Sequence, residues 1–173
     1  MQSQADVRSA LERNVKAVTL RPSVGQGTAV TKVRLRDGLA CDVEEGSWKF
    51  TVGMTQKYGG TNAGPNPGVF GRAALGSCLA IGYSMWAARM NVPVTSLDVE
   101  IHAAYDVRGE LGVDDAVRPG YSAIRYVVTV ETDAPEEDVM RMLDVADRHS
   151  SWLDDIANPV PVAREVRLTS RRG

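Results

Sequence analysis

The chain has 173 residues, 43% of them hydrophobic, and this length and composition predict one compact domain with a substantial core. Its 20 Lys and Arg residues against 22 Asp and Glu residues give a net charge of -2, so it lacks the basic excess typical of proteins that bind nucleic acid or anionic membranes. The first residues carry charges throughout and show no apolar signal core, which favours a cytoplasmic protein with small molecules or proteins as partners.

Residues 1–27 are predicted to form an N-terminal arm or surface helix, because Val7, Leu11 and Val15 recur near one face of a heavily charged segment. Residues 28–170 are predicted to form a single domain. Its first part holds three segments in which apolar and polar residues alternate as in half-buried strands, at residues 28–36, 39–43 and 48–52. Asp37-Gly38 predicts a tight hairpin between the first two of them.

A loop rich in glycine, proline and asparagine follows at residues 57–68 and leads into a helix near Val69–Met90. This loop is predicted to shape a site at the start of the helix. The helix is apolar nearly all round, but its uncharged stretch is too short and too rich in small residues to cross a bilayer. One sheet cannot easily bury every face of such a helix, so a second subunit is expected to cover the rest. A monomer with an ordinary core helix is the alternative.

Alternation typical of strands returns at residues 97–105 and 121–131, which are predicted to form a second antiparallel hairpin across a flexible connection. A further helix is expected from about Pro135. Its pattern falters at His149-Ser150-Ser151, resumes, and ends near Asn158. A final strand at residues 160–169 is expected before a basic tail. Strands joined by hairpins around helices predict the α+β class with antiparallel sheets.

The two cysteines, Cys41 and Cys78, do not suggest a disulfide scaffold, because the chain shows no secretory signal. Cys41 lies on the apolar face of a predicted strand and is interpreted as structural. Cys78 lies in the central helix near the loop, where a small oxidant could meet it if a cation stabilised the thiolate. Arg34, Arg36 and Arg72 are candidate cations. The alternative is that Cys78 only packs in the core, and spacing alone favours that alternative.

No metal, cofactor or nucleotide site is predicted. His102 and His149 lie far apart and belong to no spaced cluster of ligands. The glycine motifs of nucleotide-binding loops and of the hydrolase nucleophile turn are absent from the sequence. Asp147, His149 and Ser150 are close in sequence but are interpreted as a solvated helix end. Trp152 is a candidate for lining a pocket, although core packing would account for it equally well.

Three segments together carry a more specific pattern, namely Gly59-Gly60 through Pro65-Asn66-Pro67, Ala73 through Cys78, and Ala87 through Val92. This loop, Ala-Leu-x-x-Cys helix and short turn resemble the OsmC/Ohr family of osmotically induced and organic hydroperoxide resistance proteins. The resemblance covers about residues 34–168. It implies an intertwined homodimer in which curved antiparallel sheets wrap paired central helices.

The resemblance also implies roles for individual residues. Cys78 matches the family's peroxidatic cysteine, whose thiolate attacks the peroxide. An arginine from the N-terminal strands, for which Arg36 is the candidate, would stabilise that thiolate. Gly60, Pro65 and Pro67 match the family's loop and would line the binding site with Trp152.

Two positions depart from the family pattern. The family's second cysteine, which resolves the sulfenic acid, falls on Ser150, so no intramolecular disulfide can form there. The glutamate that follows the Pro-x-Pro segment in the peroxidases falls on Gly68.

Two hypotheses follow. In the first, Cys78 reduces an organic hydroperoxide and is recycled by an external thiol, as a one-cysteine peroxidase. In the second, the fold serves as a ligand-binding or redox-sensing module without turnover.

Overall fold

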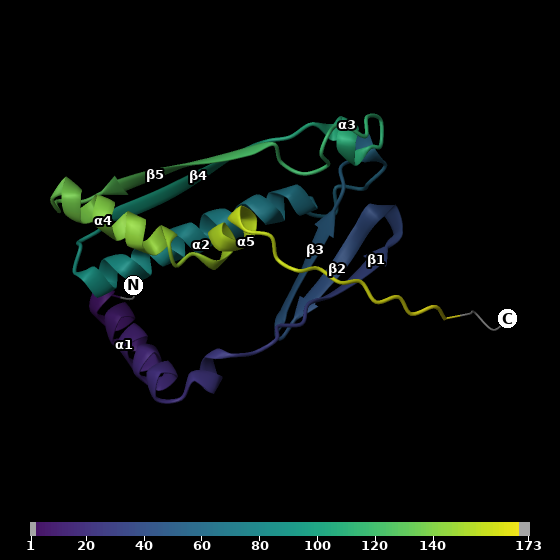
Figure 1. Ribbon diagram of the computed structural model, residues 1–173. Coiled ribbons are helices and arrows are strands. Elements are labelled where there is room, and N and C mark those ends of the chain that lie inside the picture. The colour runs from purple at the N-terminus through teal and green to yellow at the C-terminus, as the bar shows by residue number, and fades with distance from the viewer. Residues whose placement is uncertain (1–2, 170–173) are drawn as a thin grey trace.

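The computed structural model describes residues 3–169 and confirms the predicted α+β class (Figure 1). Ser170 and the basic tail after it lie outside the described residues. The helices are α1 (Gln4–Leu20), α2 (Pro67–Met90), α3 (Val107–Glu110), α4 (Glu136–Asp147) and α5 (Ser151–Ala157). The strands are β1 (Lys32–Arg36), β2 (Ala40–Glu45), β3 (Trp48–Gly53), β4 (Ser96–Ala104) and β5 (Ala123–Glu131).

The first three strands form an antiparallel sheet in the order β1-β2-β3. The Asp-Gly hairpin is confirmed, but its turn has three residues, because Arg36 pairs with Ala40. Gly38 and Leu39 both adopt positive φ, at 69° and 55°, which closes this turn. Residues 28–31 of the predicted first strand stay outside the sheet, so β1 begins at Lys32.

The central helix α2 begins at Pro67, two residues before the predicted start near Val69, and ends at Met90 as predicted. The Asn66 side chain caps its start by accepting a hydrogen bond of 3.0 Å from the Val69 N–H, and Pro67 occupies the first turn. Asn91 ends the helix in the left-handed region with a φ of 59°. Between these caps, one stripe of the helix is buried, formed by Leu75, Leu79, Tyr83 and Ala87.

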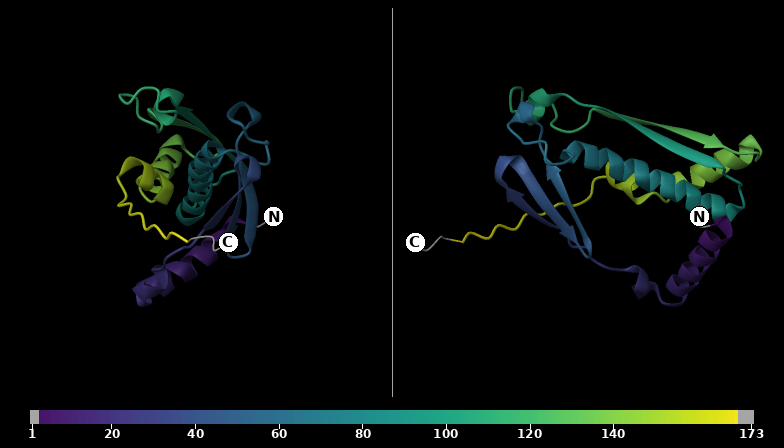
Figure 2. Two further views of the ribbon diagram at one scale, coloured as in Figure 1. Left: turned by 90° about the vertical axis from the view of Figure 1, so that its right-hand side faces the viewer. Right: turned by 180° about the vertical axis from the view of Figure 1, so that it is seen from behind.

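Two layers cover this stripe. The antiparallel β4–β5 hairpin lies along one side of α2, and α4 and α5 lie along another, as the views in Figure 2 show. Ile101 of β4 approaches α2 so closely that a Cβ added at Gly76 would stand 3.2 Å from its side chain. Glycine at this position therefore permits the close packing of hairpin and helix.

The first sheet is attached to the start of α2 by two contacts. Phe50 of β3 stacks on Phe70 of α2 with ring centroids 5.1 Å apart. The Gly53 N–H at the end of β3 donates a hydrogen bond of 3.1 Å to the carbonyl of Pro65. These contacts fix the glycine-rich loop between the sheet and the helix.

The predicted N-terminal arm is the helix α1, which is longer than its apolar pattern suggests. It contacts the far end of α2, where Arg8 donates a hydrogen bond of 2.6 Å to the carbonyl of Ala88 and Gln4 donates one of 3.1 Å to that of Val92. The bond from Arg8 satisfies a carbonyl in the last turn of α2, which has no partner within the helix, and the bond from Gln4 binds the turn that follows.

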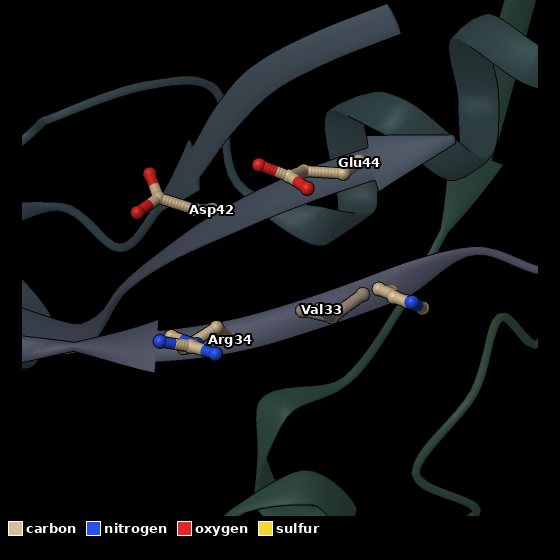
Figure 3. Close-up of a pocket in the computed structure, with 5 residues that line it drawn as sticks. Val33, Arg34, Asp42 and Glu44 are labelled. Atoms are coloured by element: carbon tan, nitrogen blue, oxygen red, sulfur yellow. The ribbon is translucent and has the colours of Figure 1, made fainter. Parts of the chain in front are cut away.

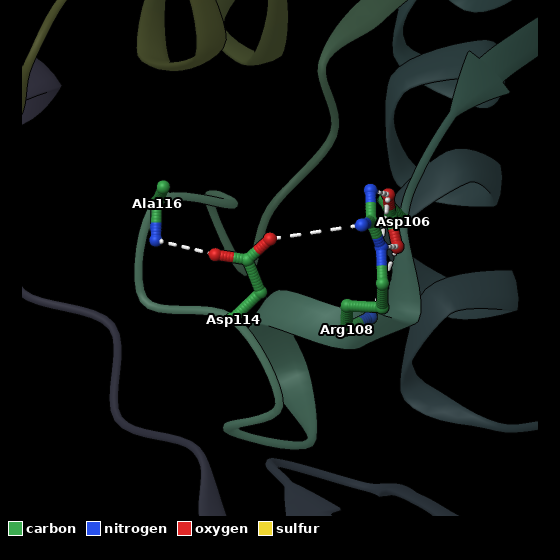
Figure 4. Close-up of polar contacts among 4 residues, drawn as sticks. All are labelled: Asp106, Arg108, Asp114 and Ala116. Atoms are coloured by element: carbon green, nitrogen blue, oxygen red, sulfur yellow. Dashed lines mark hydrogen bonds and ion pairs between the residues drawn. The ribbon is translucent and has the colours of Figure 1, made fainter.

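The connection between β4 and β5, predicted to be flexible, is folded. It contains α3, and its Arg108 side chain pairs with Asp106 at 2.6 Å and with Asp114 at 3.6 Å (Figure 4). The other oxygen of Asp114 accepts a hydrogen bond of 3.1 Å from the Ala116 N–H. The prediction missed this order because ion pairs between loop residues leave no periodic signal.

The predicted final strand at residues 160–169 is wrong for the single chain. These residues are extended but form no strand in the structure, and Val162 and Leu168 are each 93% exposed. Alternation makes a segment compatible with a sheet, but a strand forms only where a free sheet edge meets it.

Candidate functional site

The thiol of Cys78 is half-buried on α2, next to the buried stripe of that helix. The turn between α4 and α5 lies directly against it. The Cys78 Sγ is 3.5 Å from the Ser150 Oγ and 3.7 Å from the Ser151 Oγ. The fold therefore brings together two segments separated by 72 residues.

Ser150 is buried, with 6% of its surface exposed, and it is the N-cap of α5. Its hydroxyl oxygen accepts a hydrogen bond of 3.4 Å from the Leu153 N–H. Because this bond uses the oxygen as acceptor, the hydroxyl hydrogen remains available for donation to the Cys78 sulfur. The cap bond thus orients the Ser150 hydroxyl so that its hydrogen can point at the sulfur, which would stabilise a thiolate.

Two opposing effects act on the Cys78 thiol. Burial raises its pKa. Hydrogen bonds from the backbone of Trp152, from the hydroxyls of Ser150 and Ser151, and from the backbone of Ser151 lower it. The bonds outweigh the burial, so the pKa of Cys78 lies below its ordinary value. This turn thus provides donors that favour the reactive, deprotonated form.

The candidate arginines do not meet the thiol in the single chain. Arg36 pairs with Asp42 at 3.1 Å, and Arg72 donates a hydrogen bond of 2.9 Å to the Tyr121 hydroxyl. Within residues 3–169, the groups that shift the pKa of Cys78 are those of the α4–α5 turn and include no arginine. The thiolate-stabilising role predicted for Arg36 stays a prediction.

The loop residues Gly60, Pro65 and Pro67 lie before the start of α2 and at its first turn. A side chain at Gly60 would overlap the carbonyl oxygen of Met54, so only glycine fits there. At Gly68, where the family's peroxidases carry glutamate, an added Cβ would stand 3.2 Å from the Arg72 Nη1. Arg72 thus lies beside this position.

The side chain of Trp152 is 43% exposed, and its predicted place in a binding pocket stays a prediction. Cys41 lies on β2 opposite Leu35 and Val52, with intermediate exposure. Neither residue hydrogen-bonds through its side chain to Cys78.

Two shallow surface hollows lie away from Cys78, on the first sheet. One of them is lined by Lys32, Val33, Arg34, Asp42 and Glu44 (Figure 3). Its walls are mostly charged side chains of neighbouring strands, without a nucleophile. We place the candidate site at Cys78 instead, because the donors around its sulfur give that atom a specific chemistry.

Sequence reasoning missed three features of the site. Ser151 lies close to the thiol as a second hydroxyl, and Trp152 contributes a backbone donor. Asp147 accepts hydrogen bonds from the hydroxyls of Tyr83 at 2.6 Å and Tyr126 at 2.8 Å. The interpretation as a solvated helix end is therefore wrong for Asp147 and Ser150, whereas His149 is exposed. A tyrosine within the apolar stripe of α2 was the available signal.

In the part of the chain that the structure describes, no group of three or more His, Cys, Asp or Glu side chains is arranged to hold a metal ion. Among the same residues, no helix combines the length and hydrophobicity that a membrane crossing requires.

Comparison with known proteins places this geometry in context. The family of OsmC-like proteins matches residues 60–165, more than half of the chain. Comparison with curated proteins gives no match.

Several solved structures share the fold. An OsmC-like protein of Mycoplasma pneumoniae is similar with a TM-score of 0.66 and 10% identity, over 78% of this chain and 90% of that one. An OsmC-like protein of Vibrio cholerae has a TM-score of 0.58 and 14% identity, over 75% and 94% of the two chains. The organic hydroperoxide resistance protein OsmC of Legionella pneumophila has a TM-score of 0.54 and 11% identity, over 75% and 89%.

Proposed function

This chain belongs to the family of OsmC-like proteins, and we propose that it reduces organic hydroperoxides as a one-cysteine peroxidase through Cys78. The observation that carries the proposal is the set of hydrogen-bond donors that the α4–α5 turn directs at the Cys78 sulfur. A lowered thiol pKa increases the thiolate fraction at neutral pH, and the thiolate is the nucleophile in peroxide reduction. The name of the Legionella protein supports a hydroperoxide as the substrate.

In the oxidative half-reaction, the Cys78 thiolate attacks one oxygen of the hydroperoxide O–O bond. An S–O bond forms, the O–O bond breaks, and the alkoxide leaves as an alcohol after taking up a proton. Cys78 is oxidised to a sulfenic acid and the hydroperoxide is reduced. The hydroxyls of Ser150 and Ser151, at 3.5 and 3.7 Å from the sulfur, are placed to hydrogen-bond the thiolate before the attack.

The recycling step requires an external thiol, because Ser150 occupies the place from which a second cysteine would resolve the sulfenic acid. One external thiol condenses with the sulfenic acid, releasing water and forming a mixed disulfide. A second thiol then displaces Cys78 from that disulfide. The sum is one hydroperoxide and two thiols converted into one alcohol, one water and one external disulfide.

We also propose that the working form is a homodimer. On α2, the face opposite the buried stripe is exposed and carries apolar side chains, among them Ile81, which is 61% exposed. The C-terminal segment 160–169 alternates exposed apolar residues with polar ones, as an unpaired strand does. A second copy of the chain would cover both features.

Two observations favour the second hypothesis, a ligand-binding or redox-sensing module. Gly68 replaces the glutamate of the family's peroxidases, and Arg36 is paired with Asp42. A chain with this arrangement could oxidise at Cys78 without turning over.

Stopped-flow measurement of organic hydroperoxide consumption, with a monothiol as reductant, tests the peroxidase. We expect several turnovers in the wild type, none in Cys78→Ser, and wild-type rates in the matched variant Cys41→Ser. A single turnover in the wild type would favour the sensing module. Equal consumption by Cys78→Ser and the wild type would refute a role for this thiol.

A further inference from the structure

The carboxylate of Asp147 stands at an unusual place in its helix. Asp147 is the last residue of α4, where the helix dipole disfavours a negative charge. It is half-buried, and its two oxygens accept hydrogen bonds from Tyr83 of α2 and Tyr126 of β5. Since the local helix gives no reason for an acid here, its partners on the other two elements must account for its position.

Both tyrosine hydroxyls donate hydrogen bonds to the Asp147 carboxylate. Tyr83 is 1% exposed, and Tyr126 is half-buried. Burial, followed by the hydrogen bond to Asp147, raises the pKa of both hydroxyls, that of Tyr126 to about 12. The hydroxyls therefore keep their protons at neutral pH and bind the carboxylate from two directions.

A chain of contacts connects Asp147 to the Cys78 thiol. The carbonyl of Asp147 accepts a hydrogen bond of 3.2 Å from the Ser150 N–H, and Ser150 lies against Cys78. Cys78 and Tyr83 are five residues apart on the same rigid helix. The distance between thiol and turn is thus set by α2 on one side and by Asp147 on the other.

His149, the neutral-pH titrating residue type in this turn beside the always-charged Arg148, is held separately. The ring of His149 lies on Trp86 of α2 with centroids 4.8 Å apart, and its Nδ1 is 2.7 Å from the carbonyl of Val145. Arg89 covers Trp86 at 4.4 Å. These contacts hold residue 149. Ser150 is held from α5 by its cap bond to the Leu153 N–H and from α4 by the bond of its own N–H to Asp147.

We propose that Asp147 is a positioning residue, which Tyr83 and Tyr126 clamp so that Ser150, Ser151 and Trp152 hold their hydrogen-bond donors against the Cys78 sulfur. The proposal deepens the proposed function and rests on it only in taking Cys78 as the working thiol. Asp147 touches neither the thiol nor a substrate in this scheme. It acts through the turn, so its loss changes the reactivity of a residue that it does not contact.

The rate of Cys78 alkylation by iodoacetamide as a function of pH measures the pKa of its thiol without any peroxide. In Asp147→Asn, the charge is lost and the amide nitrogen cannot accept a hydrogen bond, so one tyrosine exchanges a charge-assisted bond for at most a weaker neutral one and the clamp loosens. We expect the pKa of Cys78 to rise toward the free value of about 8.5. A rise of half a unit lowers the thiolate fraction at pH 7 about threefold, and the alkylation rate falls in proportion.

The direction in which the pKa of Cys78 changes distinguishes a positioning role of Asp147 from a direct electrostatic effect of its carboxylate. If Asp147 acted only as a nearby negative charge, its removal would lower the pKa of Cys78 and speed up alkylation. Tyr126→Phe, which keeps the carboxylate, should raise the pKa in the same direction as Asp147→Asn. It also provides a second measurement if Asp147→Asn fails to fold.

Val139→Ala is the matched control, because it removes a buried side chain from the same helix away from the turn. It should lower the melting temperature and leave the pKa of Cys78 unchanged. An unchanged or lowered pKa in both Asp147→Asn and Tyr126→Phe would overturn the proposal, as would an equal rise in Val139→Ala. Failure of peroxide turnover with these pKa changes intact would refute only the proposed function.

Discussion

Replacing Ser150 by cysteine converts the external recycling step into an internal one. The Ser150 Oγ is 3.5 Å from the Cys78 Sγ, and a disulfide needs its sulfur atoms about 2.05 Å apart, so a shift of about 1.5 Å closes the bond. We therefore expect Ser150→Cys to form a disulfide with Cys78 after one equivalent of peroxide. The wild type should instead stop at a sulfenic acid, which dimedone traps and excess peroxide over-oxidises.

The stability of the variant can be estimated from the chain that the bond encloses. A disulfide across the 72-residue separation of these positions stabilises the fold by about 4 kcal/mol in the chain-entropy model. Losing Ser150 as the N-cap of α5 costs about 1 kcal/mol. The net gain of about 3 kcal/mol raises the melting temperature of a chain of this size by roughly 6 to 12 °C.

Intact-mass analysis, peptide mapping and thermal unfolding with and without dithiothreitol measure these effects. The double variant Cys78→Ser/Ser150→Cys is the control, because it carries the cap change without the bond. Formation of the Cys78 sulfenic acid in Ser150→Cys without a disulfide would refute the inferred adjacency in solution. A disulfide that leaves the melting temperature unchanged would refute the stability estimate.

Three further predictions concern the thiol, the core and the dimer. Cys78 should be alkylated faster than Cys41, because its hydrogen-bond partners lower the pKa of its thiol. Preferential labelling of Cys41, measured by mass spectrometry, would contradict this. Folding lowers the pKa of the Cys78 thiol, so ionisation of this thiol stabilises the folded protein. The stabilisation is complete above the pKa that Cys78 has in the unfolded chain, and it is lost as the pH falls through the lower pKa of the folded protein. Leu75→Ala, at a side chain with 1% of its surface exposed, should destabilise the fold by about 2–5 kcal/mol in urea unfolding, and a change below 1 kcal/mol would show that the site collapses around the lost group. Light scattering should find a dimer at micromolar concentration, and Ile81→Glu on the exposed face of α2 should weaken this dimer. A monomeric wild type would refute the dimer proposal.

The elements with strong local signals were predicted closely. Alternation located β2, β3, β4 and β5 to within a few residues, and the Asp-Gly pair located the first hairpin. The glycine- and proline-rich loop before α2 and the asparagine after it marked its ends to within two residues, because such residues act on the backbone next to them. The break at His149-Ser150-Ser151 appeared in the sequence because Ser150 is a cap and interrupts the apolar stripe.

Predictions failed where a residue's role depends on distant partners. The alternation of residues 160–169 fits a strand, but the single chain offers them no sheet edge in the structure. Arg36 pairs with Asp42 on the neighbouring strand in the single chain, so its predicted role at the thiol stays a prediction. Periodicity reports which face of a segment is apolar and does not report which other segment will meet that face.

The sequence by itself determined the local conformations, because capping, turn and packing preferences act over a few neighbouring residues. Its resemblance to the OsmC/Ohr family identified Cys78 as the candidate nucleophile. Only the tertiary structure decided the environment of that thiol. Ser150 and Ser151 reach Cys78 across a separation of more than 70 residues, and Asp147 joins Tyr83 and Tyr126 from two other elements. A thiol pKa depends on the atoms within a few ångströms of the sulfur, and those atoms come together only when the helices and the second hairpin have packed.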